Sequence, residues 1–167
     1  MAALVETGPG LQKQNHRRMN AALEDEPRKV QVAALPWRVV DDKVEVMLIT
    51  SRDTGRWILP KGWPERRETL AEAAAREAAE EAGISGGITQ HPIGSFAYDK
   101  VRYPEPDEPC QVFVYPLQVS WIAERWPERK QRERRWFAPD AAAAVVNEPD
   151  LSELILEFGA NPQRFGG

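Results

Sequence analysis

The chain has 167 residues and a formal net charge of −4 at pH 7, with 42% hydrophobic and 29% charged residues. This length suits one domain with a buried core, and the composition is that of an ordinary soluble globular protein. The acidic balance argues against a general nucleic-acid-binding protein, because such proteins are normally basic.

The sequence also disfavours membrane, secreted, disulfide-bonded and zinc-binding proteins. No apolar run approaches the roughly 20 residues that cross a bilayer, so we expect no membrane association. The start of the chain, MAALVETGPGLQKQNHRRMN, lacks the continuous apolar region of a secretory signal. Cys110 is the only cysteine, which excludes an intramolecular disulfide and fits a reducing, cytoplasmic location. With one cysteine and two distant histidines we expect no structural zinc site, so any metal would be a hard cation bound by oxygen.

Residues 1–27 mix glycine, proline and charge without a clear period, and we expect a tail or loosely attached arm before a domain at 28–167. The runs VQVAALPWRVV and KVEVMLITSR, separated by DDK, predict two adjacent strands. RWILP predicts a short third strand. Residues 69–82 lack proline and glycine and are dominated by alanine and glutamate, which predicts a helix that Gly83 ends.

The second half of the chain alternates strands and loops before it becomes helical. GGITQHPIGSFAYDKV predicts a strand interrupted by Pro92, YPEPDEP a loop, and CQVFVYPLQVSWI a very apolar strand. ERWPERKQRERRWF is a charged connection into a strand at residues 134–137. APDAAAAVVNE and PDLSELILEFG predict two helices. Strands in a mixed sheet with helices on both faces give an α/β fold.

The predicted helix at residues 69–82 carries an unusual group of acids. Glu77, Glu80 and Glu81 are spaced i, i+3, i+4 and therefore share one side, while a stripe of alanines occupies another. An ordinary solvated helix is the alternative, and the favourable Glu72–Arg76 pair is typical of one. Against it, the three acids crowd the helix C-terminus, where the helix dipole disfavours anions. Three carboxylates converging on one point suit Mg²⁺.

The motif around this helix resembles the Nudix box, G-x5-E-x7-R-E-U-x-E-E-x-G-U. Gly62, Glu68 and the run REAAEEAGI at residues 76–84 match every fixed position. The resemblance implies a Nudix fold, an α/β/α sandwich around a central mixed sheet with a loop-helix-loop. It also implies a hydrolase that uses Mg²⁺, or Mn²⁺, to cleave a nucleoside diphosphate linked to another group, or a related pyrophosphate.

Carried over by position, the resemblance assigns the catalytic and metal-binding roles. The metal ligands would be Gly62, Glu77, Glu80 and Glu81. One of these glutamates, or a later one, would position or deprotonate the attacking water. Glu68 and Arg76 would brace the catalytic loop and have a structural role.

The flanks of the box point to a substrate group. EVMLITSRDTGRWILPKGWPERRET and VFVYPLQVSWIAERWPERKQRERRWFAPDAA are similar to the diphosphoinositol polyphosphate phosphohydrolases, which also act on diadenosine polyphosphates. The likeness covers roughly residues 30–144. It favours these two substrate classes over ADP-ribose, nucleotide sugars or a 5′-triphosphate RNA end. A Nudix-fold sensor that binds a nucleotide without cutting it is the alternative from another class.

A phosphate-rich ligand requires cations from the protein. Residues 124–135 carry six basic against three acidic residues, so either a local positive island or an ordinary solvated loop is expected. Arg132 and Arg134 alternate just before a strand and would project to one face. The predicted substrate-binding residues are Ser51, Arg52, Lys61, Arg132 and Arg134.

The positions of the aromatic residues predict two different roles for them. Those in strand-like segments are expected in the core: Trp37, Trp57, Trp121 and Trp136. Trp63, Tyr98 and Tyr103 lie near predicted loops and are candidates for stacking on adenine.

Overall fold

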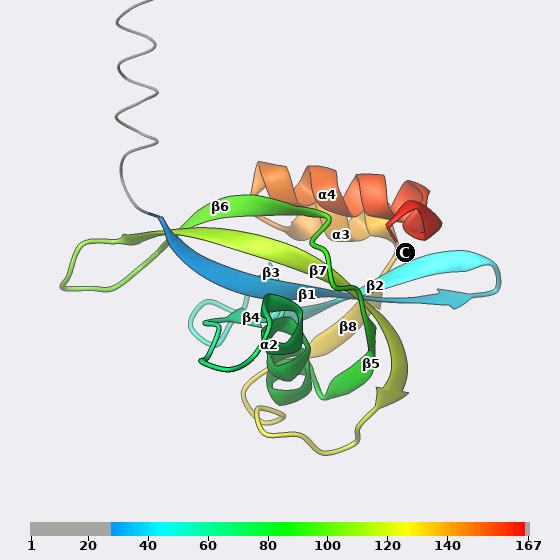
Figure 1. The fold of residues 1–167 in the computed structure, drawn as a ribbon, viewed down its shortest axis with the longest axis horizontal. Helices are drawn as coiled ribbons and strands as arrows, with labels where there is room; N and C mark the ends of the chain where they lie inside the picture. The colour runs from blue at the N-terminus through cyan, green and yellow to red at the C-terminus, as the bar shows by residue number, and fades with distance from the viewer. Residues whose placement is uncertain (1–27, 166–167) are drawn as a thin grey trace, which may run out of the picture.

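The computed structural model describes residues 28–165, so the tail expected at residues 1–27 lies outside the described range. Eight strands form one mixed sheet, with helices on both of its faces (Figure 1). The strands are β1 (Lys29–Val40), β2 (Lys43–Thr50), β3 (Trp57–Ile58), β4 (Lys61–Gly62), β5 (Ile84–Ile88), β6 (Gly94–Lys100), β7 (Glu108–Ile122) and β8 (Arg134–Phe137). The helices are α2 (Leu70–Glu77), which continues into a π-helical turn (Ala78–Ala82), α3 (Pro139–Val145), α4 (Pro149–Ala160) and a 3-10 turn (Pro162–Arg164).

Strand β1 is the centre of the sheet. It pairs antiparallel with β2 and parallel with β7, from Lys29 opposite Cys110 to Trp37 opposite Gln118. The long strand β7 then pairs with β6 along its first half and with β5 along its second. β4 pairs with β1 on the side of β2, and β3 and β8 pair with β2. This arrangement confirms the predicted mixed sheet.

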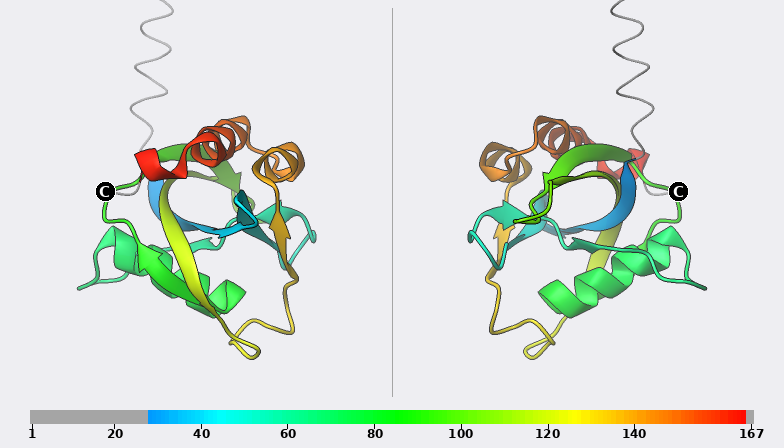
Figure 2. Two further views of the ribbon diagram at one scale, coloured as in Figure 1. Left: turned by 90° about the vertical axis from the view of Figure 1, so that its right-hand side faces the viewer. Right: turned by 90° about the vertical axis from the view of Figure 1, so that its left-hand side faces the viewer.

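The continuous apolar runs of β1 and β2 arise because both faces of the sheet are covered. Figure 2 shows α3 and α4 above the sheet and α2 below it. Alternate residues therefore enter different cores: Leu35 and Leu48 pack with α4, whereas Val32 and Met47 pack with α2. The α/β/α sandwich is thus confirmed.

The alanine stripe of the glutamate helix lies against the sheet. Ala71, Ala78 and Ala82 of the predicted stripe are buried in the core formed with β1, β2 and β7, and Ala75 packs against it partly buried. The side chain of Thr69 caps the helix by accepting from the Glu72 N–H at 3.1 Å. Gly83 ends it in the left-handed conformation, φ 65°, as the sequence predicts. The π-helical form of the last turn was not expected.

One aromatic prediction is wrong. Trp121 is 66% exposed near the end of β7, while Trp37, Trp57 and Trp136 pack against the two cores as predicted. The end of β7 runs past the cover of the helices, so its strand character does not bury its side chains. Within residues 28–165, the helices are all too short or too polar to span a membrane.

Candidate active site

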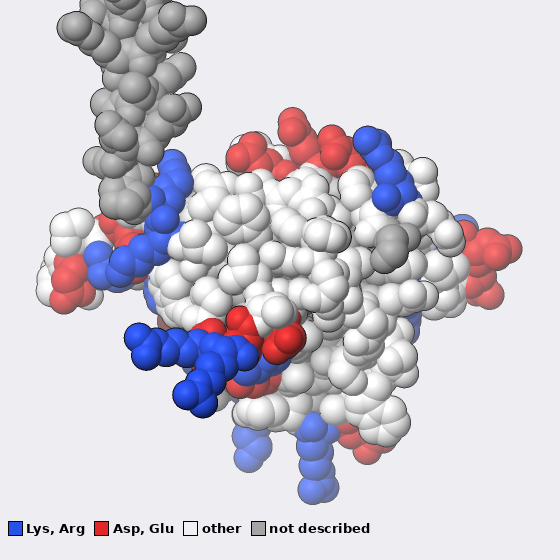
Figure 3. Space-filling view, viewed as in Figure 1, with Lys and Arg blue, Asp and Glu red and all other residues white. Residues whose placement is uncertain are grey.

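A cavity of about 970 Å³ opens beside α2, between this helix, β4, the end of β6 and the loop that precedes β8. Figure 3 shows acidic and basic side chains interleaved over α2 on this face. Six basic and seven acidic residues line the cavity, so its own charges nearly cancel and it has no excess of cations for a polyanion. The cavity brings together these predicted residues: Ser51, Arg52, Lys61, Gly62, Arg76, Glu77, Glu80, Glu81 and Arg132.

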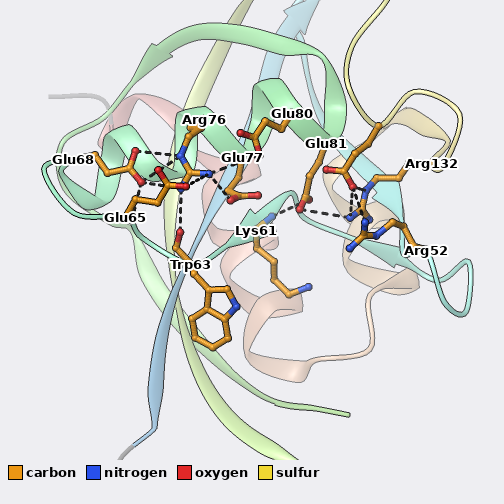
Figure 4. Close-up of polar contacts among 11 residues, drawn as sticks. Arg52, Lys61, Trp63, Glu65, Glu68, Arg76, Glu77, Glu80, Glu81 and Arg132 are labelled. Atoms are coloured by element: carbon orange, nitrogen blue, oxygen red, sulfur yellow. Dashed lines mark hydrogen bonds and ion pairs between the residues drawn. The ribbon is translucent and has the colours of Figure 1, made fainter. Parts of the chain in front are cut away.

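The three box glutamates line this cavity together but differ in exposure. Glu77 and Glu81 are buried, at 9% and 7% exposed, whereas the side chain of Glu80 is 46% exposed. All three come from the end of α2 and its π-helical turn, a distortion often found at functional sites. Figure 4 shows them in a row along the helix.

The charge of the two buried carboxylates is compensated only in part. Burial is the main cause that raises the pKa of Glu81 to about 8; the Arg132 charge opposes this rise and the Glu77 charge adds to it. Burial also raises the pKa of Glu77, whose carboxyl group is in hydrogen-bonding contact with that of Glu81. Both carboxyl groups resist ionisation and face each other. A hard divalent cation bound between them would stabilise both as anions, so the pair fits such a cation.

The third carboxylate, that of Glu80, lies on the Arg76 side of this pair, because Nη1 of Arg76 contacts both Glu77 and Glu80. Within residues 28–165, no three acidic, histidine or cysteine side chains gather closely enough to form a complete metal site. The Glu80 carboxylate instead lies 3.8 Å from Arg76. Glu80 is partly exposed and lines the same cavity as Glu77 and Glu81.

Gly62 lies in contact with the carboxylate of Glu77. A Cβ built on Gly62 would lie 2.3 Å from both Cδ and Oε1 of Glu77, far inside van der Waals contact. Only glycine lets the β4 backbone come this close to the acid. The geometry therefore explains the need for glycine at the first position of the motif.

Arg76 links the motif loop to the helix. Its guanidinium donates to Glu68 at 2.8 Å, to Glu77 at 2.8 Å and to the backbone carbonyl of Trp63 at 3.0 Å (Figure 4). Hydrogen bonding to Arg76 also lowers the pKa of Glu68. This geometry supports the bracing role expected of Glu68 and Arg76, since one guanidinium holds the loop and a predicted metal ligand together.

Arg132 and Arg52 approach the cavity from its other side. The Arg132 side chain is only 6% exposed; it donates to the Thr50 carbonyl at 3.1 Å and lies 3.5 Å from Glu81. Arg52 is 59% exposed and lies 3.5 Å from Glu128. Ser51 shares a hydrogen bond of 2.8 Å with the hydroxyl of Thr54, a contact that shapes the turn before β3.

The structure corrects the prediction for Arg134. Its guanidinium lies outside the cavity lining and donates to the carbonyls of Ala82 at 2.9 Å and Ala123 at 2.6 Å. It also stacks on Trp126, 3.8 Å from the ring centroid. Only Arg134 belongs to β8, while Arg132 lies in the preceding loop, so the alternation expected of a strand does not apply to the pair.

Trp126 is a residue that sequence reasoning missed. Its indole N–H donates to the Glu81 carbonyl at 3.1 Å, and its ring fills the space beside Gly83. The backbone N–H of Glu128 donates to the Glu80 carbonyl at 3.1 Å. Together with Arg134, these donors satisfy the carbonyls that the end of a helix leaves unpaired, and so fix the turn that carries the glutamates.

Arg134→Met is expected to lower the free energy of unfolding by about 2–3 kcal/mol, because the carbonyls at the helix end lose their donor. Urea denaturation measures this change. Arg129→Met, an exposed change in the same loop, is the control and should stay within about 0.5 kcal/mol. A weaker substrate affinity for Arg134→Met at unchanged stability would restore the original prediction of a substrate contact.

Other residues at the cavity were not predicted from the sequence. Arg56 and Lys100 line it, and so does Glu128, a later acid of the kind that the family resemblance allows as a base. The sequence signal for the two cations is weak, since each is a single basic residue at the edge of a strand. Among the aromatic candidates, Trp63 and Tyr98 line the cavity, whereas Tyr103 is 93% exposed and does not.

Comparison with known sequences gives consistent matches. The family model of the NUDIX domain matches residues 29–158. The chain is 35% identical over 120 residues to Nudix hydrolase 12, mitochondrial, of Arabidopsis thaliana, a match that covers 70% of this chain but only 59% of that protein. It is 31% identical to Nudix hydrolase 16, mitochondrial, of the same plant, with 84% of each chain covered. It is also 31% identical to the Bos taurus diphosphoinositol polyphosphate phosphohydrolase 3-beta, over 80% of this chain and 81% of the relative.

Solved structures with the same fold are more distant in sequence. A Caenorhabditis elegans Ap4A hydrolase binary complex matches with a TM-score of 0.58 at 20% identity, over 82% of this chain and 99% of that one. The NUDIX domain of Shewanella oneidensis NrtR, complexed with ADP ribose, matches with a TM-score of 0.59 at 16% identity, over 81% and 90%. At these identities the matches show a shared fold.

Proposed function

Because the chain belongs to the Nudix family, we propose that it is a divalent-metal-dependent hydrolase that cleaves a phosphoanhydride bond in a phosphate-rich small molecule. The observation that carries the proposal is that all three box glutamates line one open cavity, two of them as facing buried carboxyls. Diadenosine polyphosphates and diphosphoinositol polyphosphates are the proposed substrates. The likeness to a diphosphoinositol polyphosphate phosphohydrolase supports this choice.

The residues proposed to hold the metal are Glu77, Glu80 and Glu81, with Gly62 placed against Glu77. When bound, Mg²⁺ would offset the phosphate charge and lower the pKa of a coordinated water. Mn²⁺ has the same preference for oxygen ligands and is an alternative.

The protein's own groups orient the two buried acids. Arg76 holds Glu77 from one side at 2.8 Å, and the backbone N–H of Lys61 donates to Glu81 at 3.2 Å from the other. These contacts fix the direction of each carboxylate before a substrate arrives, so that little reorganisation is needed during the reaction. The burial of Glu77 and Glu81 keeps both groups largely out of contact with bulk water, which strengthens their interactions.

A substrate panel tests the proposed function. With Mg²⁺, diadenosine tetraphosphate or diphosphoinositol pentakisphosphate should be cleaved at a kcat/KM at least about tenfold above that of ADP-ribose, with 5′-triphosphate RNA as a further arm. Anion-exchange chromatography of the products locates the broken bond. The substrate choice would be overturned if ADP-ribose were cleaved rapidly while the diadenosine and diphosphoinositol polyphosphates were not cleaved. Tight binding of every ligand without cleavage would favour the nucleotide sensor.

A further inference from the structure

We propose that Lys61 and Lys100 form an anion subsite that binds phosphates beyond those at the cleaved bond. Of the two proposed substrate classes, the enzyme would therefore prefer diadenosine polyphosphates with three or more phosphates in a chain over diphosphoinositol polyphosphates, whose phosphate chains contain two. This inference rests on the proposed function and specifies the substrate class of the same cavity. The inference also differs from the sequence-based expectation, which placed the main phosphate contact in the arginine-rich loop at residues 124–135.

The first argument is that the arginines of the cavity are already paired. Each of the four arginines in its lining has a carboxylate partner. The pairs are Arg52–Glu128 at 3.5 Å, Arg56–Glu148 at 3.2 Å, Arg76–Glu68 at 2.8 Å and Arg132–Glu128 at 3.2 Å. A phosphate that binds any of them must compete with this partner, and part of the attraction is lost.

The two lysines differ in this respect. Among residues 28–165, neither the Lys61 nor the Lys100 ammonium has a carboxylate within ion-pair distance. Glu81 accepts from the backbone N–H of Lys61 at 3.2 Å. Both side chains line the cavity, and neither ammonium group is engaged in an ion pair. Burial lowers the pKa of the Lys61 ammonium, so a bound phosphate would supply the counter-charge that this buried group lacks.

Aromatic rings hold these ammonium groups in place. The Lys61 nitrogen lies 4.9 Å from the ring centroid of Tyr98, and the Lys100 nitrogen lies 5.2 Å from that of Trp63. A ring attracts a cation through its quadrupole but leaves the net charge and the N–H donors available. The Tyr98 hydroxyl donates to Gln31 at 2.6 Å, which fixes the orientation of this ring.

The strands explain why the four side chains meet. Tyr98 and Lys100 are two residues apart on β6, and Lys61 and Trp63 are two residues apart along the segment that starts in β4, so each pair projects to one side. Each lysine crosses to the aromatic residue of the other segment. Figure 4 shows Lys61 and Trp63 together on the strand side of the carboxylate row.

This position determines which part of a substrate the lysines can contact. Lys61 precedes Gly62, whose backbone touches the Glu77 carboxylate, so the subsite begins next to the proposed cleavage centre. Lys100 lies at the end of β6, beside the exposed Val101, at the margin of the cavity. A pyrophosphate held at the glutamates would occupy only the first part of this path, whereas a longer phosphate chain would reach Lys100. The same geometry gives Trp63 a supporting role, since Lys100 covers a face that adenine would need for stacking.

Binding of inorganic phosphates of increasing length tests the subsite. Isothermal titration with pyrophosphate, tripolyphosphate and tetrapolyphosphate uses Ca²⁺ in place of Mg²⁺, and phosphorus NMR checks that each ligand stays intact. Lys100→Met should weaken tetrapolyphosphate about tenfold and pyrophosphate by no more than about twofold, as expected for one lost charged contact. Lys43→Met, at the turn between β1 and β2 and outside the cavity lining, is the control for loss of one charge.

Substitutions of Trp63, whose ring contacts the Lys100 ammonium, test the subsite in a second way through the same phosphate affinities. Trp63→Leu should reproduce part of the length-dependent loss, and Trp63→Phe should retain binding because an aromatic face remains. Lys100→Arg should restore most of the affinity. Equal losses for every phosphate length, or no loss in Lys100→Met, would overturn the subsite. Hydrolysis of the substrate panel is measured in parallel: a length-dependent loss in binding without any cleavage would reject the proposed function and leave the subsite standing.

Discussion

Glu81→Gln is expected to lower kcat on the preferred pyrophosphate substrate by about 10²–10⁴-fold, the range for loss of an essential acid or base group. Glutamine keeps the shape of the side chain and its contact with the Lys61 N–H, but it removes the negative charge next to Glu77. The proposed metal then loses a charged ligand. Steady-state kinetics with saturating Mg²⁺ measure the effect.

The same substitution should leave the fold intact. Because burial raises the pKa of Glu81 from 4.5 to about 8, the charged carboxylate is disfavoured in the folded protein. The cost to stability grows as the pH rises above 4.5 and is complete above about 8. A neutral glutamine removes it, so the free energy of unfolding at pH 9 should be unchanged or higher. Glu72→Gln, an exposed change on α2, is the control and should retain wild-type turnover. Wild-type turnover in both variants would show that Glu81 has no role in catalysis.

Gly62→Ala is expected to lower kcat/KM by about 10²-fold, because displacement of a reacting group by about 1 Å has an effect of this size. The added methyl group would overlap the Glu77 carboxylate, with 2.3 Å to its Cδ, and must push it from the cavity floor. The displaced group is the end of a flexible side chain, so thermal unfolding should change little.

Gly87→Ala is the matched control for the glycine substitution. A Cβ at Gly87 meets no atom within 4 Å, so this variant loses the same backbone freedom without displacing a carboxylate. It should keep wild-type kcat/KM. If Gly62→Ala is as active as Gly87→Ala, the close contact between the β4 backbone and Glu77 does not matter for function.

Local patterns in the sequence were sufficient to predict the central features. The spacing of Glu77, Glu80 and Glu81 places them on one side of a helix in any fold, and the alanines on the opposite side specify close packing on a sheet. The β-branched runs predict strands buried on both faces. These inferences depend on periodicity along one element, so tertiary contacts had little opportunity to change them.

Features that depend on distant contacts were not predictable. Arg134 donates hydrogen bonds to the carbonyls at the end of the helix. It can do so because the loop at residues 123–133 folds back onto Ala82 and Gly83, some 50 positions earlier in the chain. Lys100 faces the cavity only because the folded sheet brings the end of β6 to Trp63, which follows β4, although β1 and β7 separate these two strands in the pairing order. The exposure of Trp121 likewise depends on where the covering helices end.

The π-helical turn at residues 78–82 has a similar origin. Nothing in its alanine and glutamate composition disfavours an ordinary α-helix. Donors from the loop, the Trp126 indole and the Glu128 N–H, satisfy the carbonyls of Glu81 and Glu80. We infer that these contacts select the wider turn, which an isolated helix would not adopt.

The most direct test of the account is a titration of Mn²⁺ followed by electron paramagnetic resonance. The wild-type protein and the double variant Glu77→Gln/Glu81→Gln are compared at pH 8. We expect the wild type to bind Mn²⁺ and the double variant to bind it at least about tenfold more weakly, because both buried charged ligands are gone. Equal Mn²⁺ affinity in the two proteins would contradict a metal site at these carboxylates.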